Sequence, residues 1–269
     1  MSKEPIFTGV CTAIVTPFRP DGAIDHGAFG ELIEAQIVQG VDAICICPID
    51  PGAMESVFAE ALEAGIVVIT HEANTNCKNI LYDIEAFSNE DFGAMTGEKI
   101  IETMGGEGTY ATLVGQVTKA SHMAWTEGAV NYIKANCPEI KLLNDEYPNG
   151  TSDDTYEGAY NAAKELLTKY PEIKLFRTCS SLEPTGVAKA IDELGLKGKV
   201  SIVGTGTPND LRGLVEDGTM AYICTWDPAA ACYAMLTLAQ KILIDEDQTA
   251  LSGQGWLVIN KDNVNDYNF

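Results

Sequence analysis

Short apolar segments alternate with longer segments in which apolar residues recur every three or four positions. The segment Ala53–Ala64 has the longer pattern and ends at Gly65, and the apolar run Val67–Thr70 follows it at once. A short apolar run is typical of a buried strand, and the longer spacing is typical of an amphipathic helix. The predicted strands are Val10–Val15, Ala43–Cys47, Val67–Thr70, Ala111–Val114, Lys141–Asn144, Leu175–Thr178, Ser201–Val203, Tyr222–Thr225 and Trp256–Ile259. The predicted helices are His26–Gln39, Ala53–Ala64, Asp91–Met104, Ser121–Asn136, Asp154–Lys169, Thr185–Leu194, Asp210–Asp217 and Ala229–Ile244.

This alternation predicts an α/β protein in which parallel sheets carry helices on both faces. In open sheets of this kind, ligands bind at the carboxyl ends of the strands, where loops lead into helices. The residues that follow the predicted strands are therefore the first candidates for a binding site. These segments are Pro48–Pro51, His71–Asn76, Thr118–His122, Thr178–Ser181, Thr205–Asp210 and Trp226–Asp227.

Composition and charge narrow the classes of partner. The chain has 269 residues, of which 46% are hydrophobic and 21% are charged, so it can bury a core. Its formal net charge of -22 repels phosphate backbones and anionic lipid, which argues against nucleic acid and membrane partners. No apolar run is long enough for membrane insertion, and Ser-Lys-Glu-Pro follows Met1 in place of a signal peptide. We therefore expect a cytoplasmic protein.

The cysteines give no sign of a metal site or a cofactor. They form no CxxC pair and no cluster with the spacing of a zinc site. Most stand in apolar surroundings, where a thiol packs as a small hydrophobic group. We therefore expect buried free thiols in a reducing compartment. The eight cysteines are Cys11, Cys45, Cys47, Cys77, Cys137, Cys179, Cys224 and Cys232.

Three polar motifs each have a simple structural alternative. The loop Gly204–Asp210 can bind an anion, but it lacks the Lys-Ser/Thr ending of a P-loop, so a capped strand-to-helix turn is favoured. His71-Glu72 begins like a zinc-protease motif without its second histidine, which leaves Glu72 as an acceptor for ligand hydroxyls. His122 opens a predicted helix, where capping and ligand contact both remain open.

Two tryptophans differ in their predicted roles. Trp226 stands at a strand end beside Asp227, and a flat indole next to a carboxylate suits a polyhydroxylated ring. Trp125 lies inside a predicted helix, so we assign it to the core.

The first segment, Ile6–Cys47, resembles the TIM-barrel aldolases of the dihydrodipicolinate synthase and N-acetylneuraminate lyase family. The resemblance stops at Cys47–Pro51, where that family has a Gly-Thr-Thr-Gly-Glu motif, and no Schiff-base lysine has a counterpart downstream. Lys174 and Lys199 stand at strand entrances, the wrong end for such a lysine. The class I aldolase activity that the family implies is therefore disfavoured. The matching segments are Phe7–Gly9, Ala13–Phe18, Asp21–Asp25 and Gly40–Ile44.

From Asp42 to Phe269 the chain resembles type I periplasmic sugar-binding proteins, in their autoinducer-2 and rhamnose-binding branch. The family implies two α/β lobes that close over a ligand in an interlobe cleft without catalysing a reaction, and an ABC permease as a partner. On this basis the first lobe comprises residues 1–86 plus about 227–250, and the second comprises 87–226 plus about 251–269. The matching segments are Ile46–Pro51, Gly65–Glu72, Val203–Asn209, Asp217–Thr219, Trp226–Pro228 and Ile259–Val264.

Carried over position by position, this resemblance implies a set of ligand contacts. The implied ligand is a small polar molecule, a sugar or an autoinducer-2-like compound. Glu72 replaces the aspartate that is usual in the family, and no arginine aligns with the site. The implied contacts are Glu72, Ser121, His122, Thr178, Ser180, Thr205, Asn209, Trp226 and Asp227.

The start of the chain departs from this family. Only one predicted strand and one predicted helix precede the strand that begins at Ile44, whereas the family has a strand, a helix and a second strand there. We therefore hypothesise a chimera, natural or engineered, whose first lobe starts with a TIM-barrel-derived β-α-β unit and whose junction lies near Asp42–Pro48. Three functions remain open: sugar binding with reduced affinity, a folded chimera without biological activity, and a class I aldolase or lyase.

Overall fold

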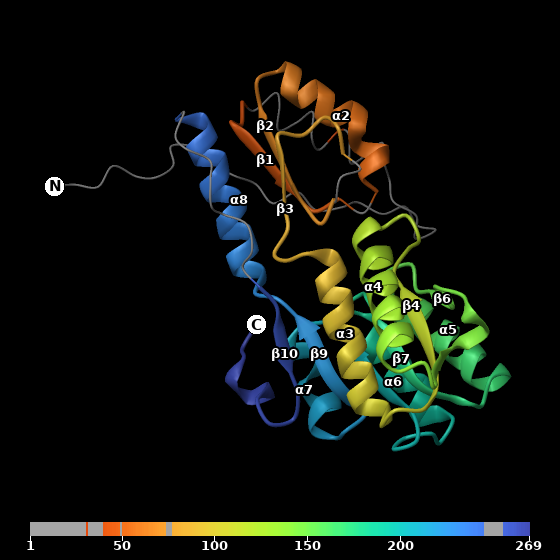
Figure 1. Ribbon diagram of the computed structural model, residues 1–269. Helices are drawn as coiled ribbons and strands as arrows, with labels where there is room; N and C mark the ends of the chain where they lie inside the picture. The colour runs from red at the N-terminus through yellow and green to blue at the C-terminus, as the bar shows by residue number, and fades with distance from the viewer. Residues whose placement is uncertain (1–30, 32–39, 49, 74–76, 245–254) are drawn as a thin grey trace. The chain divides into compact units, whose positions relative to one another are not determined.

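The computed structural model describes residues 31, 40–48, 50–73, 77–244 and 255–269 (Figure 1). The predicted strand Val10–Val15 and nearly all of the predicted helix His26–Gln39 lie outside the described residues. The chain divides into two compact units. The first is Met1–Ala86 with Pro228–Gln254, and the second is Phe87–Asp227 with Gly255–Phe269.

The described part of the first unit contains a parallel sheet with a helix on each face. Its elements are β1 (Ala43–Ile46), α2 (Pro51–Glu63), β2 (Val67–His71), β3 (Tyr82–Ile84) and α8 (Pro228–Leu243). The strands lie in the order β1-β2-β3. Ile44 and Val68 pack against α2, whereas Ala43 and Val67 pack against α8. Successive residues of a strand face opposite ways, so both faces of this sheet are apolar.

The second unit is built on a larger sheet. Its strands are β4 (Gly108–Val114), β5 (Ile140–Leu142), β6 (Gly150–Thr151), β7 (Ile173–Thr178), β8 (Ser201–Gly204), β9 (Met220–Thr225) and β10 (Leu257–Ile259). They lie in the order β10-β9-β8-β7-β4-β5, and β6 pairs with the end of β4. All these pairs are parallel except that of β9 with β10. The parallel strands therefore end at a common edge.

Helices cover both faces of this larger sheet (Figure 1). They are α3 (Asn89–Met104), α4 (Ala120–Asn136), α5 (Tyr156–Lys169), α6 (Glu183–Glu193) and α7 (Pro208–Glu216). The main core lies under α5, α6 and α7, where Ala163, Val187 and Leu211 pack on Phe176 and Ile202. On the other face, α3 and α4 pack against each other closely enough that a Cβ at Gly93 would lie 2.5 Å from the carbonyl oxygen of Trp125.

The predicted α/β class with parallel sheets is confirmed. Each predicted helix that falls wholly in the described part of the chain coincides closely with an observed helix. Two short strands were not predicted. β3 holds only Tyr-Asp-Ile and β6 only Gly-Thr, so neither has the apolar run from which a strand is predicted.

The expectation that most cysteines are buried is wrong. Cys179 and Cys224 are buried, but Cys47 and Cys232 are exposed, and the other described cysteines are partly exposed. Cys47 lies beyond the end of β1, and Cys232 lies off the face of α8 that buries Ala231 and Met235. An apolar neighbourhood in sequence is therefore a weak guide near the end of a strand or on a half-buried helix. Cys11 lies outside the described residues.

No helix in the part of the chain that the structure describes is both long enough and apolar enough to cross a membrane.

Candidate functional site

The candidate site lies at the carboxyl edge of the large sheet in the second unit. Thr178 at the end of β7 is level with Gly204 at the end of β8. The backbone N–H of Thr205 donates a hydrogen bond to the carbonyl oxygen of Thr178 at 3.2 Å. Thr178, Ser180 and Thr205 are all buried. The structure therefore brings three of the predicted site residues onto two neighbouring strand ends.

The side chain of Thr178 packs tightly against the next strand. A Cβ at Gly204 would lie 1.9 Å from Thr178 Oγ1, so the close approach of β7 and β8 requires glycine at position 204. Within the described residues this buried hydroxyl has no hydrogen-bond partner. A buried hydroxyl without a partner is unfavourable, so it is well suited to accept or donate a bond to a ligand.

His122 holds the neighbouring loop, between β4 and α4. Its Nδ1 accepts a hydrogen bond from the backbone N–H of Gly115 at 3.1 Å, so the ring carries its proton on Nε2. Burial lowers the pKa of His122 well below its ordinary value, and the positive charges of Lys119 and Arg177 lower that pKa further. The imidazole is therefore neutral. Ser121 is buried beside it at the start of α4.

Trp226 lies half-buried in an aromatic cluster formed by Phe87, Phe92, Trp125, Trp226 and Trp256. Its ring centroid is 5.4 Å from that of Phe87 and 5.6 Å from that of Trp125. Trp125 is 1% exposed, and its Nε1 donates to Asn89 Oδ1 at 2.5 Å, which confirms its assignment to the core. Part of the Trp226 ring is therefore engaged by neighbouring rings, and the remainder is accessible.

Two predicted residues lie on exposed parts of the second unit. Asn209 is exposed in the first turn of α7, and its backbone N–H donates to the carbonyl oxygen of Phe269 at 3.1 Å. Asp227 is exposed next to Trp226. In the glycine loop before α7, Thr207 Oγ1 donates to Asp210 Oδ2 at 2.6 Å. Thr207 is the residue before α7 and makes no side-chain cap bond, so the loop is a strand-to-helix turn without the predicted cap.

Glu72 lies in the first unit, at the end of β2. It is buried, and its backbone adopts a left-handed conformation with φ at 59°. Residues other than glycine rarely adopt this conformation. His71 Nδ1 donates to the carbonyl oxygen of Ile84 at 2.6 Å, and its Nε2 lies 3.7 Å from Glu72 Oε1. On β3, Asp83 Oδ1 accepts a bond from Thr70 Oγ1 at 2.7 Å. Two carboxylates therefore stand near this strand edge.

Sequence reasoning missed two buried charges on β7 and α6. Arg177 is fully buried, its Nη1 donates to Thr126 Oγ1 at 2.9 Å, and it also contacts Cys179 Sγ. Glu183 is fully buried at the first position of α6. Burial raises the pKa of Glu183 to about 7, against the effect of the hydrogen bonds that it accepts. The available signal was an arginine inside the apolar run Leu175–Thr178, one residue before its end.

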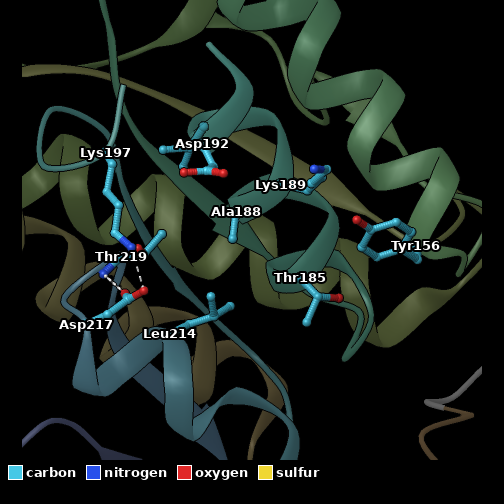
Figure 2. Close-up of a pocket in the computed structure, with 10 residues that line it drawn as sticks. Tyr156, Thr185, Ala188, Lys189, Asp192, Lys197, Leu214, Asp217 and Thr219 are labelled. Carbon is cyan, nitrogen blue, oxygen red and sulfur yellow. Dashed lines mark hydrogen bonds and ion pairs between the residues drawn. The ribbon is translucent and has the colours of Figure 1, made fainter. Parts of the chain in front are cut away.

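A separate surface pocket of about 360 Å³ lies on the helical side of the second unit, along α6 and α7 (Figure 2). Lys197 Nζ lies 2.7 Å from Asp217 Oδ2, and Asp217 Oδ1 accepts a bond from the Thr219 N–H at 2.9 Å. These lining residues precede β8 and β9, at the amino ends of the strands. The pocket is therefore distinct from the candidate site. The described residues contain no group of three or more His, Cys, Asp or Glu side chains that could hold a metal ion.

A short stretch of the chain also has relatives of a different kind. Over 42 residues the chain is 55% identical to 4-hydroxy-tetrahydrodipicolinate synthase from Hydrogenobaculum sp. (strain Y04AAS1), a match that covers 16% of this chain and 14% of that enzyme. A second match, to the same enzyme from Acetivibrio thermocellus, is longer and less identical: 30% identical over 140 residues, covering 52% of this chain and 44% of that enzyme. The identity to this enzyme family is therefore highest over a short stretch.

Most of the chain matches another family. Residues 9–247 match the model of the periplasmic binding protein domain. The chain is 27% identical over 206 residues to the D-allose-binding periplasmic protein of Escherichia coli (strain K12), covering 74% of this chain and 65% of that protein. The chain thus spans about two thirds of the length of this relative.

Solved structures agree on the fold. An ABC transporter solute binding protein from Burkholderia graminis C4D1M, in complex with D-arabinose, superposes with a TM-score of 0.82 at 22% identity. The match covers 95% of this chain and 86% of that protein. The matched family is periplasmic, so the comparisons do not support the expected cytoplasmic location. The chain belongs to the periplasmic binding protein domain family, whose sugar-binding members are not enzymes.

Proposed function

We propose that this chain binds a small sugar or a sugar-derived polar ligand and does not catalyse its conversion. The family supports this proposal, since one relative is named as a D-allose-binding protein and one similar structure holds D-arabinose. The single observation that carries it is the row of buried polar side chains at the carboxyl edge of the large sheet. Among them, Thr178 has a buried hydroxyl with no hydrogen-bond partner among the described residues.

The chemistry of this edge suits a polyhydroxylated ligand. Thr178, Ser180 and Thr205 offer hydroxyls that can donate or accept, and the neutral ring of His122 offers a donor at Nε2. The accessible part of Trp226 offers an apolar platform for the face of a sugar ring. A few fixed polar groups in an apolar frame are typical of sites that orient a small ligand.

The proposal extends to further contact residues, to the identity of the ligand and to the partner. Ser121, Asn209, Asp227 and Glu72 are further ligand contacts that the family resemblance implies. Autoinducer-2 and rhamnose are among the proposed ligands, because the chain resembles the branch that binds them. The proposed partner is an ABC permease. The net charge of -22 favours an uncharged sugar over a sugar phosphate.

A thermal-unfolding screen tests the proposal. The ligands are D-allose, D-arabinose, other pentoses and hexoses, rhamnose and autoinducer-2. A ligand present at a hundred times its Kd stabilises the folded protein by about 2.7 kcal/mol, which is readily seen as a higher Tm. A cooperative melt that none of these compounds shifts would contradict sugar binding and would favour a folded chain without a working site.

A trapping experiment on the same protein distinguishes sugar binding from class I aldolase activity. Lys174 and Lys199 lie at the amino ends of β7 and β8, away from the strand ends at which ligands bind. Trapping with pyruvate and borohydride should therefore leave the chain unlabelled. Covalent labelling would favour a class I aldolase instead. The chimera remains a hypothesis about origin, and it does not alter the proposed ligand class.

A further inference from the structure

The carboxylate of Glu183 joins two loops at the edge of the large sheet. Its Oε1 accepts a hydrogen bond from Ser152 Oγ at 2.8 Å. Its Oε2 accepts the backbone N–H groups of Cys179 at 2.7 Å and Ser180 at 3.0 Å. Ser152 follows β6, whereas Cys179 and Ser180 follow β7. One buried side chain therefore ties the end of β7 to the loop before α5.

This arrangement is more than a helix cap. The residue before α6, Leu182, offers no side-chain cap, and Glu183 reaches back to amides that lie outside its own helix. The two amides flank the side chain of Cys179 and belong to the turn that carries Ser180. Thr178 directly precedes this turn. A change at Glu183 is therefore transmitted to two residues that the proposed function places against the ligand.

We infer that Glu183 is a positioning residue for ligand binding, because it fixes the turn that presents Thr178 and Ser180. This inference rests on the proposed function. Glu183 itself need not touch the ligand, since its two oxygens already accept three bonds. Its contribution is to hold the turn in one conformation before the ligand arrives, which reduces the entropy lost on binding.

The proton on Glu183 gives this role a measurable signature. Burial raises its pKa to about 7, the bonds from Ser152, Ser180 and Cys179 oppose that rise, and the negative charge of Asp154 adds to it. Burial raises the pKa of the neighbouring Cys179 thiol to about 11, and the negative charge of Glu183 adds to that rise, so the thiol stays neutral. Of Glu183 and Cys179, Glu183 is the one whose charge changes between pH 5.5 and 8.5.

The geometry accommodates both charge states. When Oε1 is protonated, the hydroxyl of Ser152 can turn and accept the proton, while Oε2 keeps both amides. When Glu183 is charged, the two amide bonds are charge-assisted and stronger. The turn is therefore held more firmly at high pH, and ligand affinity should increase with pH across this range.

Three variants test the inference: Glu183→Gln, Glu183→Ala and the control Glu157→Gln, which removes an exposed carboxylate from α5. The probes are D-allose and D-arabinose, titrated by calorimetry at pH 5.5, 7.0 and 8.5. Glutamine can reproduce all three bonds without the charge, so Glu183→Gln should stay within about threefold of the wild-type Kd and lose the pH dependence seen in wild type. Glu183→Ala should weaken binding by about tenfold or more, because both amides lose their acceptor. Glu157→Gln should behave as wild type.

A second readout needs no ligand. In wild type, the backbone amide NMR signals of Cys179 and Ser180 should shift with pH with a midpoint near 7, and they should not do so in Glu183→Gln. If Glu183→Ala does not fold, the pH profile of Glu183→Gln and these signals carry the test.

The possible failures are distinguishable. Titrating amides in a wild-type protein that binds neither probe nor any ligand of the thermal screen would overturn the proposed function and leave the contact of Glu183 with the turn intact. Wild-type affinity in Glu183→Ala, or the same pH dependence of affinity in Glu183→Gln as in wild type, would overturn the positioning role. Amides that do not titrate in the wild type would overturn the role of the proton.

Discussion

Two strand ends, that of β7 in the second unit and that of β2 in the first, both place polar side chains in buried surroundings. At β7 the polar residues are held by other side chains, since Glu183 binds the following turn and Gly204 leaves room for Thr178. At β2, Glu72 lies 3.7 Å from the His71 ring, and its backbone adopts a left-handed conformation with φ at 59°. Both edges hold polar side chains through contacts with neighbouring groups, but the β2 edge also carries a strained backbone at Glu72, so mutations at the two edges should affect stability in different ways.

The packing at β7 is most directly broken at Gly204. In Gly204→Ala the new Cβ would lie 1.9 Å from Thr178 Oγ1 and 2.6 Å from the Thr178 carbonyl oxygen. Because the nearest backbone atom cannot move without separating β7 from β8, we expect the free energy of unfolding to fall by about 3 kcal/mol. Urea unfolding measures this loss.

The control is Gly213→Ala on α7, where a Cβ would meet nothing within 4 Å. This variant should be more stable than wild type by about 1 kcal/mol, because alanine is a better helix former than glycine. A Gly204→Ala protein as stable as wild type would show that β7 and β8 do not pack as closely as described.

The hydrogen bonding at β7 should make stability depend on pH. The pKa of Glu183 is raised from 4.5 to about 7 on folding, so the folded state holds this proton more tightly than the unfolded state. The resulting contribution is fully present below pH 4.5 and is lost as the pH rises to about 7. We expect the wild type to lose about 2 kcal/mol of unfolding free energy from this group between pH 5 and pH 8.

Urea unfolding of wild type and Glu183→Gln at both pH values isolates this contribution, because glutamine does not titrate. Glu193 on the same helix is a useful contrast. Hydrogen bonds from Tyr160, Lys164 and Lys189 lower its pKa to about 2, so its contribution has the opposite sign and disappears only as the pH falls. The same pH slope in wild type and Glu183→Gln would argue against a raised pKa at position 183.

The strain at β2 should be relieved by glycine. In Glu72→Gly the left-handed backbone no longer opposes a side chain, so we expect the free energy of unfolding to rise by about 1 kcal/mol. The proposed function also predicts a lower sugar affinity in this variant, because Glu72 is one of the proposed ligand contacts. The matched control is Glu60→Gly on the exposed side of α2, where glycine should cost about 1 kcal/mol. A loss of stability in both variants would mean that Glu72 is not strained.

The sequence was enough to predict the strands and helices around the candidate site. Apolar runs and helical spacing indicated β7 and α6 and the loop between them, because each follows from a local pattern. The contact of Glu183 with Ser152 joins residues 31 positions apart, and no spacing rule contains it. Arg177 was visible as a charge in an apolar strand, but its burial depends on α4, which supplies Thr126 from 51 positions away.

Contacts between residues distant in sequence also explain the different outcomes for Trp125 and Trp226. Trp125 was assigned to the core because it stands inside a helix, and the structure confirms this. Trp226 was expected to face a ligand because it stands at a strand end. Phe87 and Trp125, far away in sequence, decide how much of its ring remains accessible. Local position therefore predicted which element a side chain belongs to better than it predicted what covers that side chain.

The smallest effect on stability should come from the residue that matters most to the proposed ligand. Thr178 Oγ1 has no hydrogen-bond partner in the described part of the chain, so Thr178→Val removes no bond from the folded protein. We expect its free energy of unfolding to change by less than about 1 kcal/mol, while sugar affinity falls by about tenfold. Ser152→Ala is the counterpart: it removes a hydroxyl that donates to the Glu183 carboxylate, and it should cost about 2 kcal/mol. Urea unfolding and calorimetric titration of both variants separate the two roles. If Thr178→Val were as costly as Ser152→Ala and bound sugar like wild type, the hydroxyl of Thr178 would serve the fold, and the ligand contacts at this edge would have to come from other side chains.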